Sequence, residues 1–376
     1  KKKRCIPMKK FIAMMMVAAL CLTMLCGVAA ADGEVFVSWY TFGDVYLSSV
    51  RTALNAAMEE KGLSYVDKDS NANQQTQTDD INTALVTGAS AIVINMVESG
   101  AIGTAETLMN AVKAQDVPVV FFNRAVSTDN EEAAALFKSY EKSAFVGTDF
   151  RQAGMMQGDM IGEYVLENYD AIDLNGDGVI SYVMFKGDEA NQEAIYRTQY
   201  AVENADAILT AAGKPALSFY DESNTNKYLV DLNGTWSNTA SFDYMQTILA
   251  QYNEANGNMV ELVICNNDDM ALGAVNALQN AGYNLPGGEN CTVIPVFGVD
   301  ATDAAKELIA NGKMTGTVKQ DAEGMAAAIA QIAKAVGEGT ALKDAVAATA
   351  ESNTEMYSVA EGVATKLYVA YAPYTA

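Results

Sequence analysis

The sequence predicts an α/β protein of two lobes, each built on a parallel sheet with helices on both faces. Its 376 residues are enough for about two domains. From residue 35 onward, short apolar runs alternate with amphipathic stretches, which is the pattern of βαβ units. Residues 117–123 and 294–300 resemble each other, each an apolar run that ends in a side chain able to hydrogen-bond. This repetition indicates two lobes of one design.

The elements follow one another in a regular order. In the first lobe we expect strands at 35–40, 64–67, 91–95 and 117–122, with helices at 46–61, 76–88 and 101–115. In the second lobe we expect strands at 180–186, 216–220, 260–265 and 293–298, with helices at 150–168, 189–212, 237–255, 267–282 and 301–312. Ligands of open α/β sheets bind beyond the carboxyl ends of the strands, so the residues that end each strand are the candidate site.

Composition excludes several classes of function. The chain has 47 Asp and Glu against 24 Lys and Arg, and its formal charge of -23 argues against a nucleic-acid partner. It contains no histidine, which removes His-dependent catalytic triads and His metal sites. The G-x-G-x-x-G, P-loop and G-x-S-x-G fingerprints are absent from the expected places, so dinucleotide binding, P-loop phosphate binding and serine hydrolysis have no sequence support.

Residues 1–31 are predicted to be a secretory signal peptide. Six Lys and Arg residues precede an uncharged run at 11–31, and Met8 is the natural start of such a leader. A retained membrane anchor is one alternative, because about 20 apolar residues can span a bilayer. Lipid attachment at Cys26 is the other, although the preceding Leu25 is large for such a site. All three predict a periplasmic or otherwise extracytoplasmic protein.

Two cysteines follow the predicted leader, Cys265 and Cys291. An extracytoplasmic compartment permits a disulfide between them. Cys265 ends one predicted strand, however, and Cys291 precedes another, which places them at opposite ends of a parallel sheet. We therefore expect two buried thiols.

Residues 173–181 match the first part of an EF-hand calcium loop. Oxygen donors alternate through Asp173, Asn175 and Asp177, followed by the carbonyl of Val179 and the side chain of Ser181. The twelfth position, where an EF-hand has a bidentate glutamate, is a methionine, and the following residues read as a strand. Two interpretations remain open: a calcium loop completed by a distant glutamate, or an ordinary Asn-Gly-Asp-Gly turn.

Acids and amides end several predicted strands. Asp44, Asn95, Asn267 and Asp300 would meet at one edge of the cleft, with Arg197 and Trp236 available nearby. Carboxylates accept from hydroxyl groups while amides and guanidinium groups donate to them, so this set suits a neutral polyol. Paired carboxylates also allow an alternative, a secreted glycoside-active enzyme that uses Asp44 or Glu193 with Asp300.

At these residues the chain resembles the periplasmic galactose/glucose-binding proteins, which are sugar receptors of ABC importers with the type I periplasmic-binding fold. The resemblance runs from about residue 35 to 371. Its anchors are the loop at 173–181, Lys186-Gly187 with Arg197 ten residues after that glycine, and the segments 261–268, 294–300 and 316–321.

The resemblance implies a set of site residues. Its calcium ligands (Ca2+) would be Asp173, Asn175, Asp177, Val179, Ser181 and Glu261, with Glu261 as the remote bidentate ligand. Its monosaccharide site would be Asp44, Tyr46, Asn95, Asn191, Glu193, Arg197, Trp236, Asn267, Asp300 and Gln320. Tyr46, Asn191, Glu193 and Gln320 depart from the family pattern, where Phe, His, Asp and Asn are familiar, so a preference between glucose and galactose stays open.

The resemblance also implies a mechanism without bond breaking. Two lobes, 32–145 plus 319–357 and 146–318 plus 358–376, would be joined by three crossings near 124–146, 318–320 and 355–368. They would close on one monosaccharide by hinge bending. The closed form would dock on an ABC import permease, with a chemoreceptor as a further partner, and we expect the protein to act as a monomer.

Overall fold

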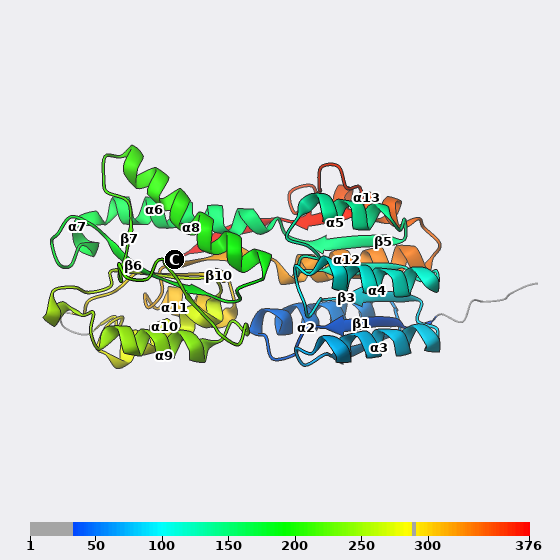
Figure 1. The fold of residues 1–376 in the computed structure, drawn as a ribbon. Helices are drawn as coiled ribbons and strands as arrows, with labels where there is room; N and C mark the ends of the chain where they lie inside the picture. The colour runs from blue at the N-terminus through cyan, green and yellow to red at the C-terminus, as the bar shows by residue number, and fades with distance from the viewer. Residues whose placement is uncertain (1–32, 288–290) are drawn as a thin grey trace, which may run out of the picture.

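The protein, described by a computed structural model for residues 33–287 and 291–376, has two lobes that lie side by side (Figure 1). Each lobe contains a seven-stranded sheet that is mostly parallel, so the predicted two-lobed α/β fold is confirmed. The predicted leader at 1–31 lies outside the described residues. Within them, no helix combines the length and the apolar character needed to cross a bilayer.

The N-terminal lobe has the strand order β12-β13-β5-β4-β3-β1-β2. Its strands are β1 (Val35–Trp39), β2 (Tyr65–Asp69), β3 (Ala91–Ile94), β4 (Val119–Phe122), β5 (Ser143–Gly147), β12 (Tyr357–Val359) and β13 (Lys366–Val369). Its helices are α2 (Val45–Glu60), α3 (Gln74–Thr87), α4 (Ile102–Ala114), α5 (Asn130–Lys138), α12 (Ala322–Gly337) and α13 (Leu342–Ser352). All pairs are parallel except the edge pair of β12 with β13.

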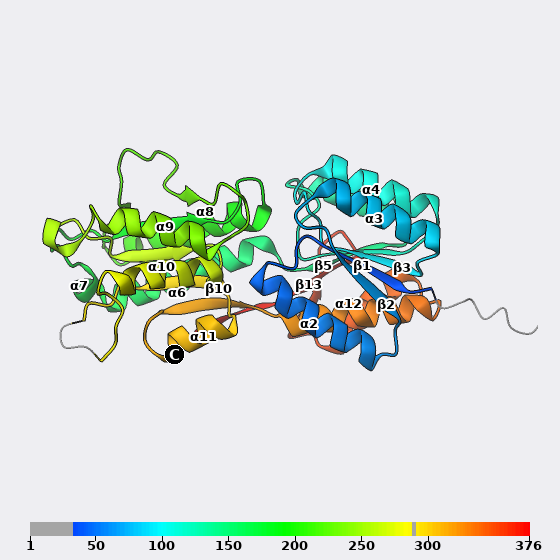
Figure 2. The ribbon, with the colours of Figure 1, turned by 90° about the horizontal axis from the view of Figure 1, so that it is seen from below.

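Alternation along β1 explains the two layers of helices in this lobe. Val37 and Trp39 point to the face covered by α2, α12 and α13, whereas Phe36 points to the face covered by α3, α4 and α5. Figure 2 shows α3 and α4 on one side of the sheet and α2 and α12 on the other. Because both faces are buried, the strands are apolar throughout instead of alternating with polar residues.

The C-terminal lobe has the strand order β14-β11-β10-β9-β6-β7, with β8 also paired to β6. Its strands are β6 (Ser181–Lys186), β7 (Ser218–Phe219), β8 (Leu229–Val230), β9 (Leu262–Cys265), β10 (Val296–Asp300), β11 (Gly316–Gln320) and β14 (Tyr371–Thr375). Its helices are α6 (Phe150–Glu167), α7 (Tyr169–Ile172), α8 (Gln192–Ala211), α9 (Asn238–Leu249), the 3-10 turn η1 (Glu254–Asn256), α10 (Asp268–Asn280) and α11 (Asp303–Ala310). In Figure 1, α6 and α8 lie above this sheet and α9, α10 and α11 below it.

Close packing of α6 against α8 fixes the helix that supplies two site residues, Glu193 and Arg197. Gly154, Gly158 and Gly162 form a stripe on α6, and a Cβ at any of them would lie 2.4 to 2.9 Å from atoms of α8. A larger residue in this stripe would push α8 away from α6. The stripe therefore sets the position of the α8 N-terminus at the cleft.

Three connections join the lobes, and two differ from the predicted ones. The chain crosses at 148–149 after β5, at Asp321 after β11, and at Ala370 between β13 and β14. The segments 124–146 and 355–368 do not cross, because β5, β12 and β13 pair within the N-terminal sheet. The predicted assignment of 358–376 to the C-terminal lobe holds only for β14.

The two described cysteines are both free thiols. Cys265 ends β9 inside the core, as expected. Cys291 is partly exposed on the connection between α10 and β10, where its sulfur accepts a hydrogen bond of 2.9 Å from the backbone N–H of Leu285. The expectation of two buried thiols is therefore wrong for Cys291, since this connection runs over the surface.

Candidate functional site

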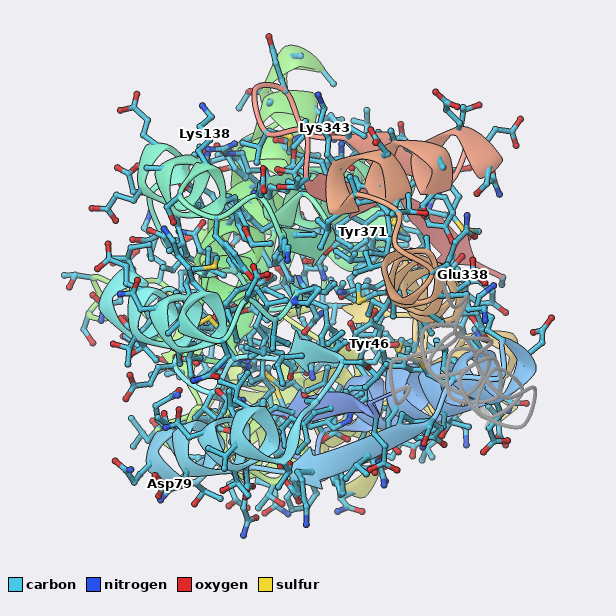
Figure 3. The ribbon with its side chains drawn as sticks, turned by 90° about the vertical axis from the view of Figure 1, so that its right-hand side faces the viewer. Tyr46, Asp79, Lys138, Glu338, Lys343 and Tyr371 are labelled. Atoms are coloured by element: carbon cyan, nitrogen blue, oxygen red, sulfur yellow. The ribbon has the colours of Figure 1, made fainter. Side chains whose placement is uncertain are left out.

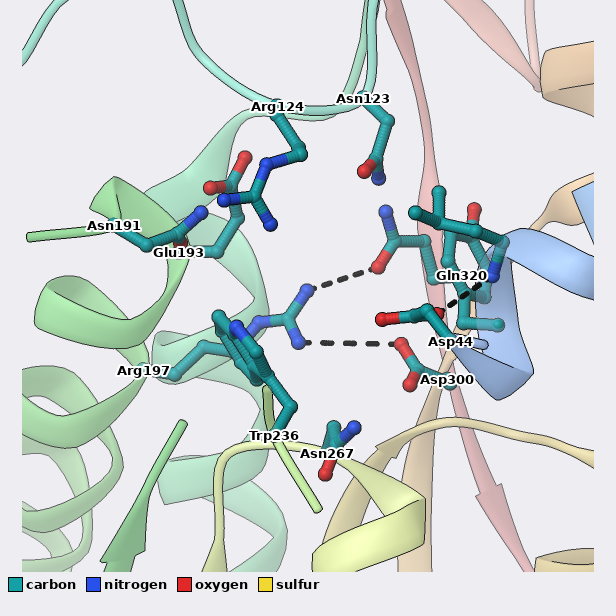
Figure 4. A pocket seen from close by; sticks show the side chains of 12 residues that line it. Asp44, Asn123, Arg124, Asn191, Glu193, Arg197, Trp236, Asn267, Asp300 and Gln320 are labelled. Atoms are coloured by element: carbon teal, nitrogen blue, oxygen red, sulfur yellow. Dashed lines mark hydrogen bonds and ion pairs between the residues drawn. The ribbon is translucent and has the colours of Figure 1, made fainter. Parts of the chain in front are cut away.

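A cavity lies between the lobes, beyond the carboxyl ends of the strands (Figure 4). Its walls are Asp44, Tyr46, Leu47, Asn123, Arg124, Asn191, Glu193, Arg197, Trp236, Asn267, Asp300 and Gln320. The structure thus brings together nine of the ten residues predicted for the sugar site, and it leaves out Asn95.

Three of the lining residues are also helix caps. Asp44 accepts a hydrogen bond from the N–H of Leu47 at the start of α2, and Asn191 and Asn267 cap α8 and α10 in the same way. A cap uses one side-chain oxygen and leaves the rest of the carboxylate or amide free. Capping therefore fixes the orientation of these side chains while their remaining atoms face the cavity.

Arg197 lies at the centre of the polar wall. One of its Nη atoms donates to the carbonyl of Asn266 at 2.9 Å, and the other donates to Oε1 of Gln320 at 2.9 Å. Asp300 forms an ion pair with it at 3.9 Å, drawn in Figure 4. Burial alone would lower the pKa of Arg197, but Tyr371, Asp300 and Glu193 outweigh it and raise the pKa. The guanidinium is therefore a permanent, rigid donor.

Trp236 is held by a loop built around Asp231. The Asp231 carboxylate accepts from the backbone of Asn233 and Ser237 and from the hydroxyl of Thr235. Trp236 has a φ of 58°, a left-handed conformation that its own side chain does not favour. Its ring lies against Gly187, where a Cβ would come within 2.1 Å of the indole. The loop and Gly187 together present one aromatic face to the cavity.

Burial raises the pKa of three acidic side chains that line the cavity. It raises the pKa of Asp44 and of Glu193, although Arg197 offsets part of the effect on Glu193. Burial also raises the pKa of Asp300 well above its usual range, with Arg197 opposing and the nearby Asp268 reinforcing the rise. A buried carboxyl group is stabilised most by a ligand whose hydroxyl groups form hydrogen bonds with it.

Six buried polar atoms of the cavity have no hydrogen-bond partner in the described part of the chain, and we call them the open polar atoms. They are Tyr46 Oη, Arg124 Nε, Glu193 Oε2, Arg197 Nε, Trp236 Nε1 and Gln320 Nε2. A buried polar group without a partner costs about 1–3 kcal/mol. The set contains donors and an acceptor, so the cavity is suited to a ligand that both donates and accepts.

Asn95 differs from its prediction. It is fully buried behind the cavity, where its side chain accepts from the N–H of Tyr40 at 3.3 Å and donates to the carbonyl of Phe122 at 3.2 Å. It also donates to the side chain of Asn123 at 3.4 Å, and Asn123 is the amide that lines the cavity. Because Ile94 pairs with Phe121, Asn95 lies opposite Phe122 and one residue short of Asn123, and its amide bonds to neighbouring segments instead of facing the cavity.

The sequence prediction missed Leu47, Asn123 and Arg124. A signal for Asn123 existed, because the internal similarity between 117–123 and 294–300 aligns it with Asp300. Asn123 has a φ of 58°, which suits asparagine better than most residues. Arg124 follows it and lies over the ring of Tyr40 at 4.1 Å, which keeps the guanidinium at the edge of the cavity.

The lobes touch across the rim of the cavity. Tyr40 donates to the carbonyl of Gly234 at 3.3 Å, and Gln192 donates to the carbonyl of Thr128 at 2.9 Å. Each of these bonds joins one lobe to the other. The two lobes are therefore in direct contact beside the cavity.

The loop at 173–181 is drawn together by the remote Glu261. This residue is fully buried, and its carboxylate accepts from the N–H of Leu174 at 2.7 Å and from that of Ser181 at 2.8 Å. Burial raises its pKa, although these hydrogen bonds oppose the rise. Asp173 Oδ2 accepts from Gly178, whereas Asp173 Oδ1 is buried and has no partner within residues 33–287 and 291–376.

The loop residues form an oxygen-rich donor set. Among the described residues, no three His, Cys, Asp or Glu side chains converge as a metal cluster. A calcium ion does not need such a cluster, since it also takes amide, hydroxyl and carbonyl oxygens. The carboxylates of Asp173, Asp177 and Glu261 with the loop's other oxygens have the chemistry of such a site, and the unpartnered Asp173 oxygen is consistent with it.

Comparisons with known proteins agree with this architecture. Residues 35–341 match the family described as periplasmic binding protein domain. The chain is 32% identical over 311 residues to the D-galactose/methyl-galactoside binding periplasmic protein MglB of Haemophilus influenzae, covering 82% of this chain and 83% of that protein. It is 23% identical over 332 residues to the ribose import binding protein RbsB of Salmonella typhimurium, covering 88% and 94%.

Solved structures share the fold. An ABC transporter periplasmic solute binding protein of Actinobacillus succinogenes with bound D-allose superposes with a TM-score of 0.66 at 16% identity, covering 91% of this chain and 97% of that one. The chain belongs to the periplasmic binding protein domain family and has the type I periplasmic-binding fold.

Proposed function

We propose that this protein captures one monosaccharide of the glucose/galactose type between its lobes and delivers it to an ABC import permease. The observation that carries the proposal is the cavity between the lobes with its six open polar atoms. A pyranose has hydroxyl groups that donate and accept around its rim, and apolar C–H groups on its faces. The rim would pair with the open polar atoms while Trp236 covers a face of the ring.

The family is one of substrate-binding proteins for transport, not of enzymes. The alternative of a glycoside-active enzyme using Asp44 or Glu193 with Asp300 therefore has no support from the family. Family membership also implies an extracytoplasmic location.

The lobes would close on a ligand because the residues that line the cavity come from both of them. Asp44, Asn123 and Arg124 belong to the N-terminal lobe, while Arg197 and Asp300 belong to the C-terminal lobe. A ligand shifts the equilibrium toward the closed form only by the contacts that it makes there and not in the open form. A sugar held by both walls has that differential affinity.

The four departures from the family pattern bear on specificity. Tyr46, Glu193 and Gln320 each contribute one of the open polar atoms, and Asn191 caps α8 beside them. Atoms that must find a partner in the ligand discriminate most strongly, because a sugar lacking the matching hydroxyl leaves them unsatisfied. These three side chains therefore set the choice among glucose, galactose and related sugars.

Isothermal titration calorimetry with glucose, galactose, xylose, ribose and arabinose tests the proposal. We expect saturable binding with one sugar per chain and a preference for glucose or galactose. Absence of heat with every sugar of the panel would contradict the proposed function. Tight binding of a pentose alone would replace the glucose/galactose assignment while leaving the sugar-binding function intact.

We also propose that the loop at 173–181 binds one calcium ion. The residues that would hold it are Asp173, Asn175, Asp177, the carbonyl of Val179, Ser181 and Glu261. The ion would contribute stability to the loop and no step of ligand binding. Adding a chelator should lower the melting temperature of the metal-loaded wild type but not of Glu261→Gln, and equilibrium dialysis should find about one calcium per chain. Equal melting temperatures with and without chelator would leave the loop as a turn.

The remaining proposals concern export and partners. We propose that 1–31 is removed as a signal peptide, that the mature protein is a monomer, and that a chemoreceptor is a further partner of the closed form. Mass spectrometry of the exported protein should find a start near residue 31 or 32. A diacylglycerol adduct on Cys26 would instead identify a lipoprotein.

A further inference from the structure

Residues on or directly beside the three connections between the lobes form one hydrogen-bonded group. Thr148 lies on the first connection, Gln320 ends the strand before the second, and Tyr371 begins the strand after the third. Thr148 Oγ1 and Tyr371 Oη share a hydrogen bond of 2.7 Å, although they are 223 residues apart in the chain. All three side chains are buried, with exposed fractions of 2%, 3% and 7%.

Arg197 joins this group to the cavity. Its Nη2 donates to Gln320 Oε1 at 2.9 Å, drawn in Figure 4, and to Tyr371 Oη at 3.4 Å. One guanidinium nitrogen thus contacts the side chain that precedes the second connection and the side chain that follows the third. The hydroxyl of Tyr371 extends the contact to Thr148 on the first connection. Tyr371 (labelled in Figure 3) and Thr148 are not among the residues that line the cavity.

We propose that Tyr371 and Thr148 are positioning residues that link occupancy of the cavity to the hinge. Through Arg197, the Tyr371 hydroxyl ties the three connections together, so that they bend as one unit. The proposal rests on the proposed function, because it concerns the closing step of the same site. It goes beyond that function by assigning a role in ligand affinity to two side chains without a ligand contact.

A hinge of three separate connections has many ways to bend, and most of them do not bring the cavity walls together. Hydrogen bonds among the connections restrict these motions, so less conformational freedom is lost when the lobes close on a ligand. Without the Tyr371 hydroxyl, the same contacts to the sugar would hold the lobes closed less effectively. Affinity would fall although the wall of the cavity is unchanged.

The alternative is that the Tyr371 hydroxyl contributes only to the stability of the fold, as a buried hydrogen-bonded hydroxyl does elsewhere, and has no role in the hinge. The chain offers a matched control for it. Tyr357 in β12 is buried to the same degree, and its hydroxyl donates to the carbonyl of Gly324 at 2.8 Å, entirely within the N-terminal lobe. Tyr357→Phe and Tyr371→Phe each remove one buried hydroxyl, but only the second removes it from the hinge.

The experiment compares Tyr371→Phe, Thr148→Val and Tyr357→Phe with the wild type by calorimetry with the best sugar of the panel and by denaturant unfolding without sugar. We expect the two hinge variants to weaken sugar affinity by about three- to tenfold and the control to stay within about twofold. Comparable losses of unfolding free energy in all three variants would show that stability is not the cause. Unchanged or improved affinity in Tyr371→Phe, or an equal loss in Tyr357→Phe, would overturn the proposal.

Small-angle scattering of the sugar-free proteins separates failure of this proposal from failure of the proposed function. We expect a larger radius of gyration for Tyr371→Phe than for the wild type and Tyr357→Phe, because a looser hinge samples wider lobe separations. If the wild type bound no sugar, the proposed function would fail and scattering would still decide the role of the hinge. Identical radii for all three proteins would count against the linkage.

Discussion

The cavity and the loop at 173–181 use similar side chains in opposite ways. In the cavity, the six open polar atoms are buried and have no hydrogen-bond partner within the described residues. In the loop, Asn175, Asp177 and Glu261 accept backbone N–H groups, and one oxygen of Asp173 is the buried side-chain atom that lacks a partner in the described residues. The comparison shows that the loop largely satisfies itself, whereas the cavity is completed by something that enters it.

This difference predicts that the two regions can be separated by mutation. Changes in the cavity should weaken ligand binding with little effect on the free energy of unfolding. Changes in the loop should lower the free energy of unfolding with little effect on ligand binding. The predictions below test that separation.

Asp300→Asn should have the largest effect on sugar affinity. The substitution keeps the shape of the side chain but replaces one carboxyl oxygen, which faces Arg197 and can accept from the ligand, with an amide nitrogen, which cannot. Hydrogen bonds to charged groups contribute about 1.5–3 kcal/mol, so we expect an affinity loss approaching 100-fold by calorimetry. An affinity within about threefold of the wild type would remove Asp300 from the binding wall.

Glu261→Gln should have the complementary effect. An amide has one acceptor oxygen where the carboxylate has two, so at least one backbone N–H at Leu174 or Ser181 loses its partner. We expect the free energy of unfolding to fall by about 2 kcal/mol in denaturant titrations, while sugar affinity changes by less than about twofold. The exposed Glu60→Gln is the control and should change neither quantity. An affinity loss as large as that of Asp300→Asn would abolish the distinction between the regions.

Gly187→Ala tests how the aromatic wall is held. The added methyl group would overlap the ring of Trp236, so the ring must move. We expect sugar affinity to fall about tenfold and the tryptophan fluorescence of the sugar-free protein to change. Gly103→Ala is the control, because a Cβ there meets no atom within 4 Å. Unchanged affinity in Gly187→Ala would mean that Trp236 does not cover the ligand.

The pH dependence of stability gives the smallest effect. Burial raises the pKa of Asp268 to about 7 and raises the pKa of Asp300 as well, so both acids hold protons in the folded protein at a pH where the unfolded chain has lost them. The folded state then binds more protons between about pH 4 and pH 7, and stability falls as the pH rises through this window. We expect the wild type to lose more stability than Asp300→Asn across it, measured by denaturant unfolding without sugar. Parallel curves would show that Asp300 titrates normally.

Periodicity in the sequence was sufficient for most of the fold. The helix expected at 46–61 is α2, Val45–Glu60, and the strand expected at 91–95 is β3, Ala91–Ile94. The hinge was harder to predict, because the lobe to which a strand belongs depends on its partners. Nothing in the local sequence of β13 indicates that it pairs with β5, or that β14, two residues later, pairs with β11 in the other lobe.

The site shows the same limit. Asp44, Asn267 and Asp300 each follow or end a predicted strand, and the prediction that they meet at the cleft is confirmed. The choice between Asn95 and Asn123 was wrong, because both directly follow apolar strands of equal length. Only the pairing of Ile94 with Phe121 shows that Asn123 lies one residue further along the sheet edge than Asn95. Likewise, only the tertiary structure shows that Thr148 and Tyr371 share a hydrogen bond and that Arg197 donates to Tyr371.

The melting temperature with and without saturating sugar, measured for the wild type, Asp300→Asn and Glu261→Gln, tests the central claim most directly. A ligand that binds only the folded state raises the melting temperature in proportion to its binding free energy. We predict that Glu261→Gln melts below the wild type yet gains as much from sugar, whereas sugar hardly shifts Asp300→Asn. A full sugar-induced shift in Asp300→Asn, or its loss in Glu261→Gln, would contradict the account.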